Sequence, residues 1–329
     1  MRWKYSKKHR LLLTIICCAI IVLSYLSGNV SALQEQVTSK NVSPSRQQLL
    51  TTSNPSKLDV TSSQSSSILM LNARTGERLL AENSDIERAP ASTIKLLTGI
   101  VAMEKLHEND VIQVGKEVLN IEGSQMGLLP GDKILVKDLL LALYLESAND
   151  AAVALAVAAA GTVEDFSIKM NEYATQIGCT KSQFKTPNGL PFPGQYTTAD
   201  DLAQIALEFI KRDDLMKYVR MKEANIEWNR SNGLRQKMLV KNTNQLLGVY
   251  PGDTGLKTGT TTEAGQCLVS YTSRLDGDIL LVLLGSKQRY VDTIELLDQG
   301  AAKIRSRSAL KNITSHPDSL ITAPGFFVR

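Results

Sequence analysis

Apolar positions follow first a strand-like and then a helical spacing where the folded body of this chain begins. An apolar run at 68–73 and a second segment at 77–83 flank Arg74-Thr75-Gly76, and this pattern predicts a β-hairpin. After Ser92, apolar residues recur at helical spacing through Leu106 and occupy nearly every side of the helix. Since a helix that is apolar nearly all round is buried, we predict a central helix that begins at Ser92.

Helical patterns dominate the middle of the chain. The longest runs from about Val136 to Ala160 and is closed by Gly161. Two shorter ones follow at Val163–Ile177 and Thr198–Lys211, and Thr198 is a suitable N-terminal cap. A Pro/Gly-rich loop, 186–194, separates these two. We therefore predict a helical subdomain in the middle of the body.

Strand patterns return from about Ala224 onward. Apolar runs at 266–272 and 278–284 flank the turn dipeptide Asp276-Gly277 and are predicted to pair, and a closing helix runs from about Val291 to Ile304. The order of hairpin, helices, strands and helix predicts an α+β fold. In this fold an antiparallel sheet is built from both ends of the body and flanked by helices, with the helical subdomain inserted.

The N-terminal segment has the layout of a secretory signal peptide. Five basic residues and no acidic ones precede an apolar run from Leu11 to Leu26, and Val30-Ser31-Ala32 follows as a small-x-small cleavage pattern. We predict that 1–32 is a signal peptide, with a retained N-terminal membrane anchor as the alternative. Both interpretations place the body in the cell envelope outside the cytoplasmic membrane, secreted or tethered, because the positive end stays inside.

Composition divides the rest of the chain. Residues 33–66 are rich in Ser, Thr, Gln and Asn and are predicted to form a flexible linker, because they cannot bury a core. The folded body spans 67–305, and 306–329 is predicted to be a tail without a clear period. The formal net charge of +4 comes from the basic leader, so the mature body is near neutral and no nucleic-acid partner is expected.

The residue inventory of the body excludes several kinds of chemistry. Its single histidine, His107, lies at the far end of a predicted helix, and the His/Cys ligands of a zinc site are absent. No nucleotide-binding glycine motif occurs either. From these two observations we expect neither a metal nor a cofactor. Cys179 and Cys267 could pair, although the apolar context of Cys267 favours a buried free thiol. A serine nucleophile in such a body needs a base other than histidine, and lysine is the natural candidate.

Serine and lysine three residues apart occur three times, at Ser92/Lys95, Ser182/Lys185 and Ser308/Lys311. Spacing alone therefore does not select one of them, but order does. Within the folded body, only Ser92-x-x-Lys95 is followed by a Ser-x-Asn, Ser147–Asn149, and then by the one Lys-Thr-Gly, Lys257–Gly259. Penicillin-binding proteins and class A β-lactamases share this trio.

Around the trio, the body resembles the low-molecular-mass penicillin-binding proteins that act as serine-type D-alanyl-D-alanine carboxypeptidases. The likeness covers about 68–305 and includes the segments Pro90–Lys95, Gly123–Met126, Glu146–Ala156, Pro187–Leu190 and Gly255–Thr261. It implies the antiparallel sheet and flanking helices of the β-lactamase and penicillin-binding-protein fold. It also implies an enzyme that removes the terminal D-Ala from peptidoglycan stem peptides and is acylated by β-lactam inhibitors.

The resemblance assigns the chemistry to three side chains. Ser92 would attack the carbonyl of the D-Ala-D-Ala bond, Lys95 would take its proton, and Ser147 would relay a proton to the leaving amine. An ordinary lysine is a poor base at neutral pH, so Lys95 must be buried and lie near a second cation, which is Lys257. The backbone N–H groups of Ser92 and Thr260 would form the oxyanion hole.

The residues that the resemblance assigns to substrate binding are Asn149, Lys257, Thr258, Gly259 and Thr260. Asn149 would hold a backbone amide of the substrate, and Thr258 with Lys257 would hold its terminal carboxylate. Gly259 would let the strand approach closely, because it has no side chain.

Neighbouring residues have simpler interpretations. Lys287 or Arg289 is a further candidate cation for the substrate carboxylate, with a solvated surface charge as the alternative. Asp150 and Glu146 are predicted to be helix salt-bridge partners, and Asn188-Gly189-Leu190 is predicted to be a structural turn near the cleft.

Two other functions remain open at this point. A class A-like β-lactamase shares the trio but needs a carboxylate on a loop between Ser-x-Asn and Lys-Thr-Gly. Here Glu164, Asp165 and Glu172 lie in helical context, and the loop 186–194 has no acidic residue. A non-catalytic wall-binding module would have lost part of the site, whereas the trio is intact in this sequence.

Overall fold

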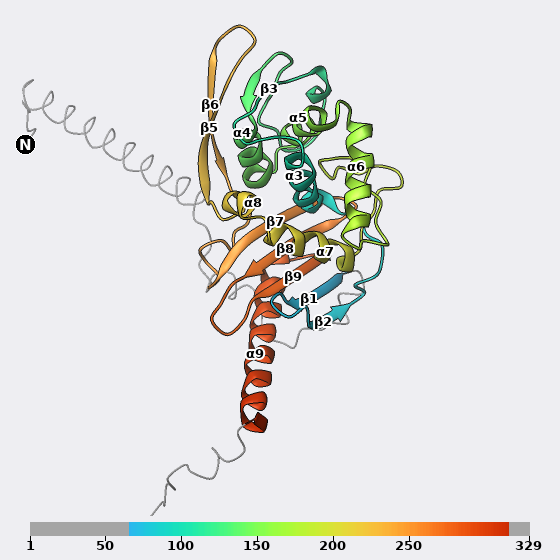
Figure 1. Ribbon diagram of the computed structural model, residues 1–329, viewed down its shortest axis with the longest axis vertical. Helices are drawn as coiled ribbons and strands as arrows, with labels where there is room; N and C mark the ends of the chain where they lie inside the picture. Colours follow the sequence, from blue (N-terminus) through green and yellow to red (C-terminus); the bar gives the residue numbers. More distant parts are fainter. Residues whose placement is uncertain (1–65, 316–329) are drawn as a thin grey trace, which may run out of the picture. The chain divides into compact units, whose positions relative to one another are not determined.

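The computed structural model describes residues 66–315; the predicted leader (1–32), the linker up to residue 65 and tail residues 316–329 lie outside the described part. Its centre is a five-stranded antiparallel sheet in the order β2-β1-β9-β8-β7 (Figure 1). The strands are β1 (Ser67–Asn72), β2 (Arg78–Glu82), β7 (Asp253–Thr261), β8 (Gly265–Thr272) and β9 (Ile279–Ser286). The predicted hairpin and the predicted strand pair around Asp276-Gly277 are confirmed, and the sheet joins both ends of the body.

The middle strand, β9, is apolar on both faces because helices cover both faces of the sheet. Leu280 and Val282 pack in the large core with the helices of the middle segment, whereas Leu281 packs in a second core with the C-terminal helix. On the first face α7 (Ala199–Ile210) lies against β1 and β9, and on the second α9 (Arg289–Ser315) lies against β8 and β9 (Figure 1). The predicted α+β architecture is therefore a sheet between two helical layers.

The C-terminal helix is longer than the sequence pattern predicts. A helix from Val291 to Ile304 is expected, whereas α9 begins at Arg289 and ends at Ser315, inside the segment predicted as a tail. Residues 305–311 are exposed, and Arg305 forms an ion pair with Asp276 at 2.8 Å. Since this part of α9 buries no apolar stripe, apolar spacing does not reveal it.

The helices of the middle segment form the layer above the first face of the sheet. Besides α7 they are η2 (Ala91–Ile94), α3 (Lys95–Met103), α4 (Val136–Leu141), α5 (Asn149–Ala160), α6 (Val163–Gln176) and α8 (Asp213–Val219). Residues 95–102 of α3 are all buried, as predicted for the central helix, but the α-helix begins at Lys95, and Ser92 lies in the 3₁₀ turn η2 that precedes it. The Thr198 hydroxyl accepts the Asp201 N–H and caps α7, also as predicted. Among the described residues no single helix is long and apolar enough to cross a membrane, although α5 and α6, bent by 83°, pass that test as a pair.

The single long helix predicted from Val136 to Ala160 is wrong, because the chain breaks at Ser147. α4 continues into a π-helical turn, η4 (Ala142–Glu146), and Ser147 then adopts a left-handed conformation with φ 62° and ψ 31°. The Asn149 N–H donates to Ser124 O at 2.7 Å instead of continuing the helical ladder. A serine does not by itself signal a helix break, so the apolar pattern of the sequence continues through residue 147 and predicts one helix.

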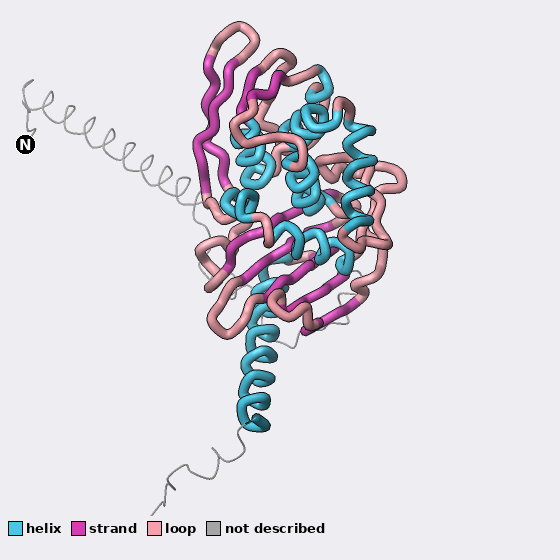
Figure 2. Tube along the Cα trace, in the orientation of Figure 1, coloured by secondary structure: helices cyan, strands magenta, loops and turns pink. Residues whose placement is uncertain are grey.

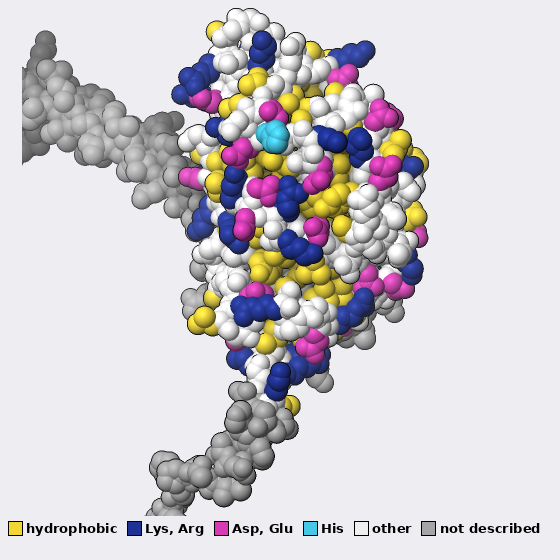
Figure 3. Space-filling model, viewed as in Figure 1, with side chains coloured by type: hydrophobic (Ala, Val, Ile, Leu, Met, Phe, Trp, Pro, Cys, Tyr) yellow, Lys and Arg dark blue, Asp and Glu magenta, His cyan; other side chains and the backbone are white. Residues whose placement is uncertain are grey.

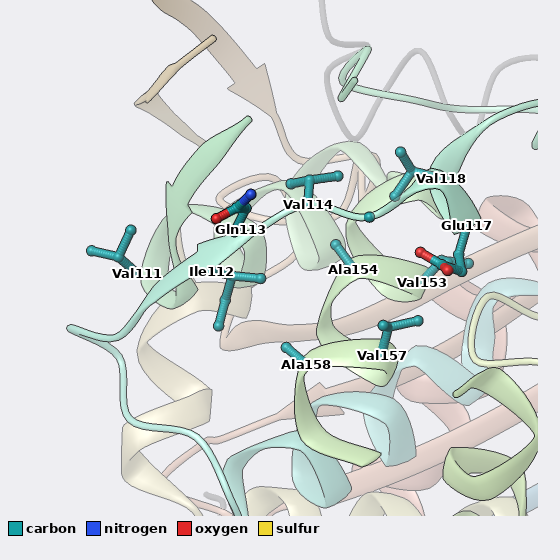
Figure 4. Close-up of a pocket in the computed structure, with 11 residues that line it drawn as sticks. Val111, Ile112, Gln113, Val114, Glu117, Val118, Val153, Ala154, Val157 and Ala158 are labelled. Atoms are coloured by element: carbon teal, nitrogen blue, oxygen red, sulfur yellow. The ribbon is translucent and has the colours of Figure 1, made fainter. Parts of the chain in front are cut away.

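A second antiparallel sheet, which the sequence pattern does not reveal as a unit, has the order β3-β4-β5-β6. Its strands are β3 (Val111–Gln113), β4 (Lys133–Leu135), β5 (Glu223–Asn229) and β6 (Arg235–Lys241). The β5–β6 hairpin projects from the body (Figure 2). A groove of about 300 Å³ between β3 and α5 is lined mainly by apolar side chains such as Val111, Val153 and Val157 (Figure 4). Charged side chains of both signs are mixed over the face shown in Figure 3.

Candidate active site

Ser92 and Lys95 lie one turn apart where a 3₁₀ turn becomes an α-helix. Ser92 belongs to η2, and Lys95 is the first residue of α3. The Thr93 hydroxyl donates to Pro90 O at 2.6 Å and fixes the turn. Lys95 Nζ lies 2.7 Å from Ser92 Oγ, so the two side chains are in direct hydrogen-bond contact.

The Lys95 amine is fully buried and surrounded by oxygen acceptors. Its Nζ donates to Asn149 Oδ1 at 2.6 Å and to Asn188 O at 2.8 Å, and it lies 3.4 Å from Ser147 Oγ. The left-handed turn at Ser147 brings both residues of the Ser-x-Asn motif to this one amine. The structure therefore places the first two motifs together.

Burial holds the pKa of Lys95 well below its usual range, because it disfavours the charged ammonium. The positive charge of Lys257 lowers this pKa further, whereas the negative charge of Asp150 opposes the shift. A neutral Lys95 amine can accept the hydroxyl proton of Ser92 at neutral pH.

Lys257, in the inner part of β7, is buried as completely as Lys95. Its Nζ donates to Thr258 O at 3.1 Å. Burial lowers the pKa of Lys257 to about 7, with a further contribution from the positive charge of Arg289 and an opposing one from Glu146. The Lys-Thr-Gly motif thus places a second desolvated amine near the first.

Two glycines let backbone segments pack directly against the Ser92 turn. A Cβ on Gly259 would lie 2.9 Å from both Ala91 Cβ and Ser92 N. Gly189 has φ 83°, and a Cβ there would lie 1.9 Å from Ala91 O. Because Gly259 has no side chain, β7 packs directly against the backbone of the Ser92 turn.

Ser92 opens into a cleft of about 320 Å³ between the helical layer and β7. The cleft is lined by Ser92, Ser124, Ser147, Thr243, Gln245, Thr258, Gly259, Thr260, Arg289 and Tyr290. Asn149 and Lys257, which are 4% and 1% exposed, lie behind this lining. Every residue of the predicted site is therefore at the cleft or directly behind it.

Arg289, rather than Lys287, is the cation at the cleft. The Arg289 Nη1 group donates to Gly259 O at 2.8 Å and to Cys267 O at 3.0 Å, and Nη2 contacts Thr260 Oγ1. Lys287 is exposed and does not line the cleft. The sequence leaves this choice open because both residues follow the same strand.

Sequence reasoning missed several contacts of the cleft. Asn188 was expected only in a structural turn, but its backbone carbonyl accepts a hydrogen bond from Lys95, a role that any residue type could fill. The Thr243 and Thr258 hydroxyls are 2.6 Å apart, and the Tyr290 hydroxyl donates to Thr243 O at 2.6 Å. The neighbouring Pro187 and Gly189 indicate a rigid loop at Asn188, so this contact could have been suspected from the sequence. Thr243 and Tyr290 belong to no recognisable motif, so their contacts could not.

Asp150 and Glu146 are not the helix salt-bridge partners that the sequence suggests. The Asp150 carboxylate accepts three backbone N–H groups of residues 126–128, at 2.9 to 3.1 Å. Glu146 Oε2 accepts the Lys241 N–H at 3.3 Å. Each carboxylate accepts backbone N–H groups of a neighbouring loop or strand. Rules for side-chain pairs within a single helix do not predict such contacts.

The other candidate groups of the sequence lie elsewhere. The Ser182 hydroxyl donates to Asp201 Oδ2 at 2.7 Å, and Ser308 is exposed on α9. Cys179 and Cys267 are free and buried, so they do not pair. Within residues 66–315, no group of three or more His, Cys, Asp or Glu side chains could hold a metal ion.

Residues 51–288 match the family model described as D-alanyl-D-alanine carboxypeptidase. The chain belongs to this family. It is 30% identical to the D-alanyl-D-alanine carboxypeptidase DacF of Bacillus subtilis, over 80% of this chain and 73% of DacF. It is 33% identical to DacC of Escherichia coli, over 70% of this chain but only 60% of DacC.

Solved structures support the same carboxypeptidase family and its fold. The Streptomyces K15 DD-transpeptidase has a TM-score of 0.68 and 30% identity, covering 72% of this chain and 96% of that chain. The D-alanyl-D-alanine carboxypeptidase DacD of Francisella tularensis has a TM-score of 0.66 and 28% identity, covering 71% of this chain and 69% of that chain. The expected penicillin-binding-protein and β-lactamase fold is therefore confirmed, as is a serine peptidase of this family.

Proposed function

We propose that this carboxypeptidase removes the terminal D-Ala of peptidoglycan stem peptides through an acyl-enzyme on Ser92. The observation that supports this most directly is the 2.7 Å contact between Ser92 Oγ and the fully buried amine of Lys95. A hydroxyl beside a neutral amine is an activated nucleophile. β7 forms one wall of the cleft, where an extended peptide can pair with it.

Acylation begins when Ser92 Oγ bonds to the scissile carbonyl carbon and Lys95 Nζ takes the Ser92 proton. The backbone N–H groups of Ser92 and Thr260 stabilise the oxyanion, a contribution of about 3–4 kcal/mol per donor. The C–N bond then breaks, and the proton passes through Ser147 to the leaving D-Ala amine. Water hydrolyses the resulting ester, with Lys95 as the base.

Recognition of a terminal carboxylate is the role of the same wall, through Thr258 on β7 and Arg289 at the start of α9. Arg289 is held by two backbone carbonyls, and Thr258 is held by the Thr243 hydroxyl. This arrangement fixes a guanidinium and a hydroxyl at the cleft before substrate arrives, with Lys257 behind them. A free C-terminal carboxylate pairs well with a guanidinium, so the cleft favours removal of the last residue of a peptide.

A class A-like β-lactamase is disfavoured by the position of the acidic side chains. Glu164, Asp165 and Glu172 are exposed on α6, and no Asp or Glu is among the described residues that line the cleft. The acyl-enzyme therefore lacks the carboxylate base that activates water in a class A β-lactamase, and Lys95 is the base that remains. We expect penicillin to acylate Ser92 and the adduct to turn over much more slowly than in a β-lactamase.

We propose that residues 67–305 act as the catalytic domain outside the cytoplasmic membrane. The basic and apolar pattern of 1–32 supports export, and the composition of 33–66 supports a flexible connection. N-terminal sequencing of the mature protein distinguishes cleavage after Ala32 from a retained membrane anchor.

The Ser92→Ala variant tests the proposed function. We expect it to lose both covalent penicillin labelling and D-Ala release, because no nucleophile remains at Lys95. Ser182→Ala is the matched control, since it removes a serine of the same motif and should retain both activities. Mass spectrometry of the labelled peptide checks the position of the adduct. Labelling of Ser92→Ala would contradict the assignment, and wild-type protein without either activity would indicate a wall-binding module.

A further inference from the structure

The cation of the cleft, Arg289, is held by uncharged oxygens. Its Nη1 group donates to Gly259 O at 2.8 Å and to Cys267 O at 3.0 Å. Its Nη2 group contacts Thr260 Oγ1, and its Nε donates to Gln266 Oε1 at 3.4 Å. Since an arginine has five N–H donors, these contacts fix the plane of the guanidinium and leave one Nη2 hydrogen for a ligand.

Two other half-buried arginines each pair with a carboxylate. Arg230 forms an ion pair with Asp132 at 2.8 Å, and Arg212 forms one with Asp214 at 2.9 Å. Arg289 forms no such pair with any Asp or Glu of residues 66–315. Its charge is therefore not compensated by the described part of the chain, and a ligand carboxylate can act as the missing partner.

Gln266 holds this arginine by both its main chain and its side chain. Gln266 Oε1 accepts the Arg289 N–H at 3.2 Å as well as the Nε hydrogen. Because Arg289 is the first residue of α9, the carboxamide also satisfies a backbone N–H that has no partner within the helix. Gln266 lies on β8 opposite Thr260 of β7, so this acceptor comes from the end of the sheet that borders the cleft.

An uncharged side chain at position 266 is not the most stabilising choice. A carboxylate there would pair with the guanidinium and would also lie at the positive N-terminal end of α9, and both interactions favour an anion. The same carboxylate would, however, compensate the charge of Arg289 inside the protein. Glutamine gives the guanidinium a fixed position and leaves its charge available to a ligand.

We propose that Gln266 is a positioning residue of the carboxylate site, which holds Arg289 in place without pairing its charge. The inference rests on the proposed function and adds to it the residue that keeps this site cationic. Gln266 acts through Arg289, since it does not itself line the cleft. A carboxylate in place of its carboxamide should stabilise the protein and weaken recognition of a carboxylate ligand, a combination that a purely structural residue would not give.

Two ligands isolate recognition of the carboxylate. Benzylpenicillin carries a free carboxylate, whereas its methyl ester carries a neutral group in the same place. We measure the rate at which each acylates Ser92, from the mass of the adduct at neutral pH, and take the ratio of the two rates.

Gln266→Glu changes the charge and little else. The ratio should fall about tenfold, the loss expected when one hydrogen bond between charged groups is weakened. The midpoint of thermal unfolding should rise by roughly 1–3 °C, because the new carboxylate pairs with Arg289 at the end of the helix. Gln266→Met has a similar size but no acceptor, so it should lower the ratio about fivefold without raising the midpoint.

Gln288 provides a matched control for the added charge. It directly precedes Arg289 at the same end of α9, is exposed, and does not line the cleft. Gln288→Glu should raise the thermal midpoint by a similar amount. The ratio should stay within about twofold of the wild-type value, because an exposed charge that does not pair with the guanidinium is screened by salt.

The outcomes separate this inference from the proposed function. An unchanged ratio in Gln266→Glu, or an equal loss for both ligands, would overturn the inference while acylation of Ser92 stands. The same loss in Gln288→Glu would overturn it too, because any negative charge near the cleft would then explain the effect. Wild-type protein that neither ligand acylates would overturn the proposed function itself. Gln266→Met tests the positioning role even if Gln266→Glu does not fold.

Discussion

Burial, more than sequence spacing, decides which serine and lysine pair can do chemistry. Lys95 has no exposed surface and shares its amine among oxygen acceptors from three segments of the chain. Ser308 and Lys311 have the same spacing, yet both are exposed on α9. A shifted pKa requires loss of water, so the motif works only where the fold closes over it.

Asp253 is a second buried titratable group, and it makes stability depend on pH. It accepts hydrogen bonds from Ser270 and Asn244, each at 3.0 Å, but burial dominates and raises its pKa from 3.8 to about 7. The folded protein therefore favours the neutral carboxyl, whereas the unfolded chain ionises above pH ~4. This contribution to stability is complete below pH ~4 and is lost as pH rises to about 7, roughly 4 kcal/mol in total.

Asp253→Asn should remove this pH dependence. We expect the free energy of unfolding of the wild type to fall more steeply between pH 4.5 and 7.5 than that of the variant, because Asn does not titrate. Urea unfolding at several pH values across this range measures both slopes. Parallel slopes for wild type and variant would show that Asp253 does not contribute.

At the scale of elements, the site depends on how closely β7 approaches η2. Gly259 is the point of contact, and its missing side chain lets the strand reach the Ser92 turn. On the other side of Ser92, the π-helical turn η4 and the left-handed Ser147 present the Ser-x-Asn motif. Three elements thus meet at one hydroxyl: the 3₁₀ turn η2, the strand β7 at a glycine, and the segment after η4 through the left-handed Ser147.

Gly259→Ala should impair acylation far more than stability. Its Cβ would lie 2.9 Å from Ser92 N, so β7 must move away and the oxyanion hole must widen. We expect the rate of penicillin acylation to fall about 100-fold or more, the loss typical of one oxyanion donor. Stopped-flow labelling measures the rate, and thermal unfolding checks the fold. A near-normal rate would mean that β7 supplies no such donor.

The sequence predicts the elements better than their irregularities. The hairpin, the buried α3 and the pairing of β8 with β9 follow from apolar periods, which the large core enforces. The break at Ser147 could not be predicted, because it depends on a hydrogen bond from the Asn149 N–H to Ser124 O, which belongs to a loop distant in sequence. The order of the three motifs correctly predicts that their residues share one cleft. A backbone acceptor such as Asn188 O cannot be predicted in this way, because any residue type supplies the same carbonyl group.

At the scale of the whole molecule, the central sheet ties two cores into one unit. Adjacent residues of β9 point to opposite faces, so Leu280 belongs to the core with α3 and α7, whereas Leu281 belongs to the core with α9. Neither layer can separate without exposing one face of the same strand. The protein should therefore unfold as a single cooperative unit.

Leu280→Ala and Leu281→Ala test this coupling from the two faces. Each should lower the free energy of unfolding by about 2–5 kcal/mol, the usual effect of removing a buried leucine side chain. Both variants should keep one transition in urea, followed by circular dichroism and by tryptophan fluorescence. Two separated transitions in Leu281→Ala would show instead that the α9 layer unfolds independently.

β1 pairs with β9 along its whole length, and just before it Ser66 Oγ donates to Gly285 O, 219 residues away. Contacts between such distant segments give a high contact order, so folding is slow and cannot finish on a partial chain. As long as the β9 segment is not available for folding, the chain lacks the central strand of the sheet and cannot form either of the two cores. If the proposed export carries the chain across the membrane unfolded, the same topology delays assembly of the serine–lysine site until almost the entire chain has been exported.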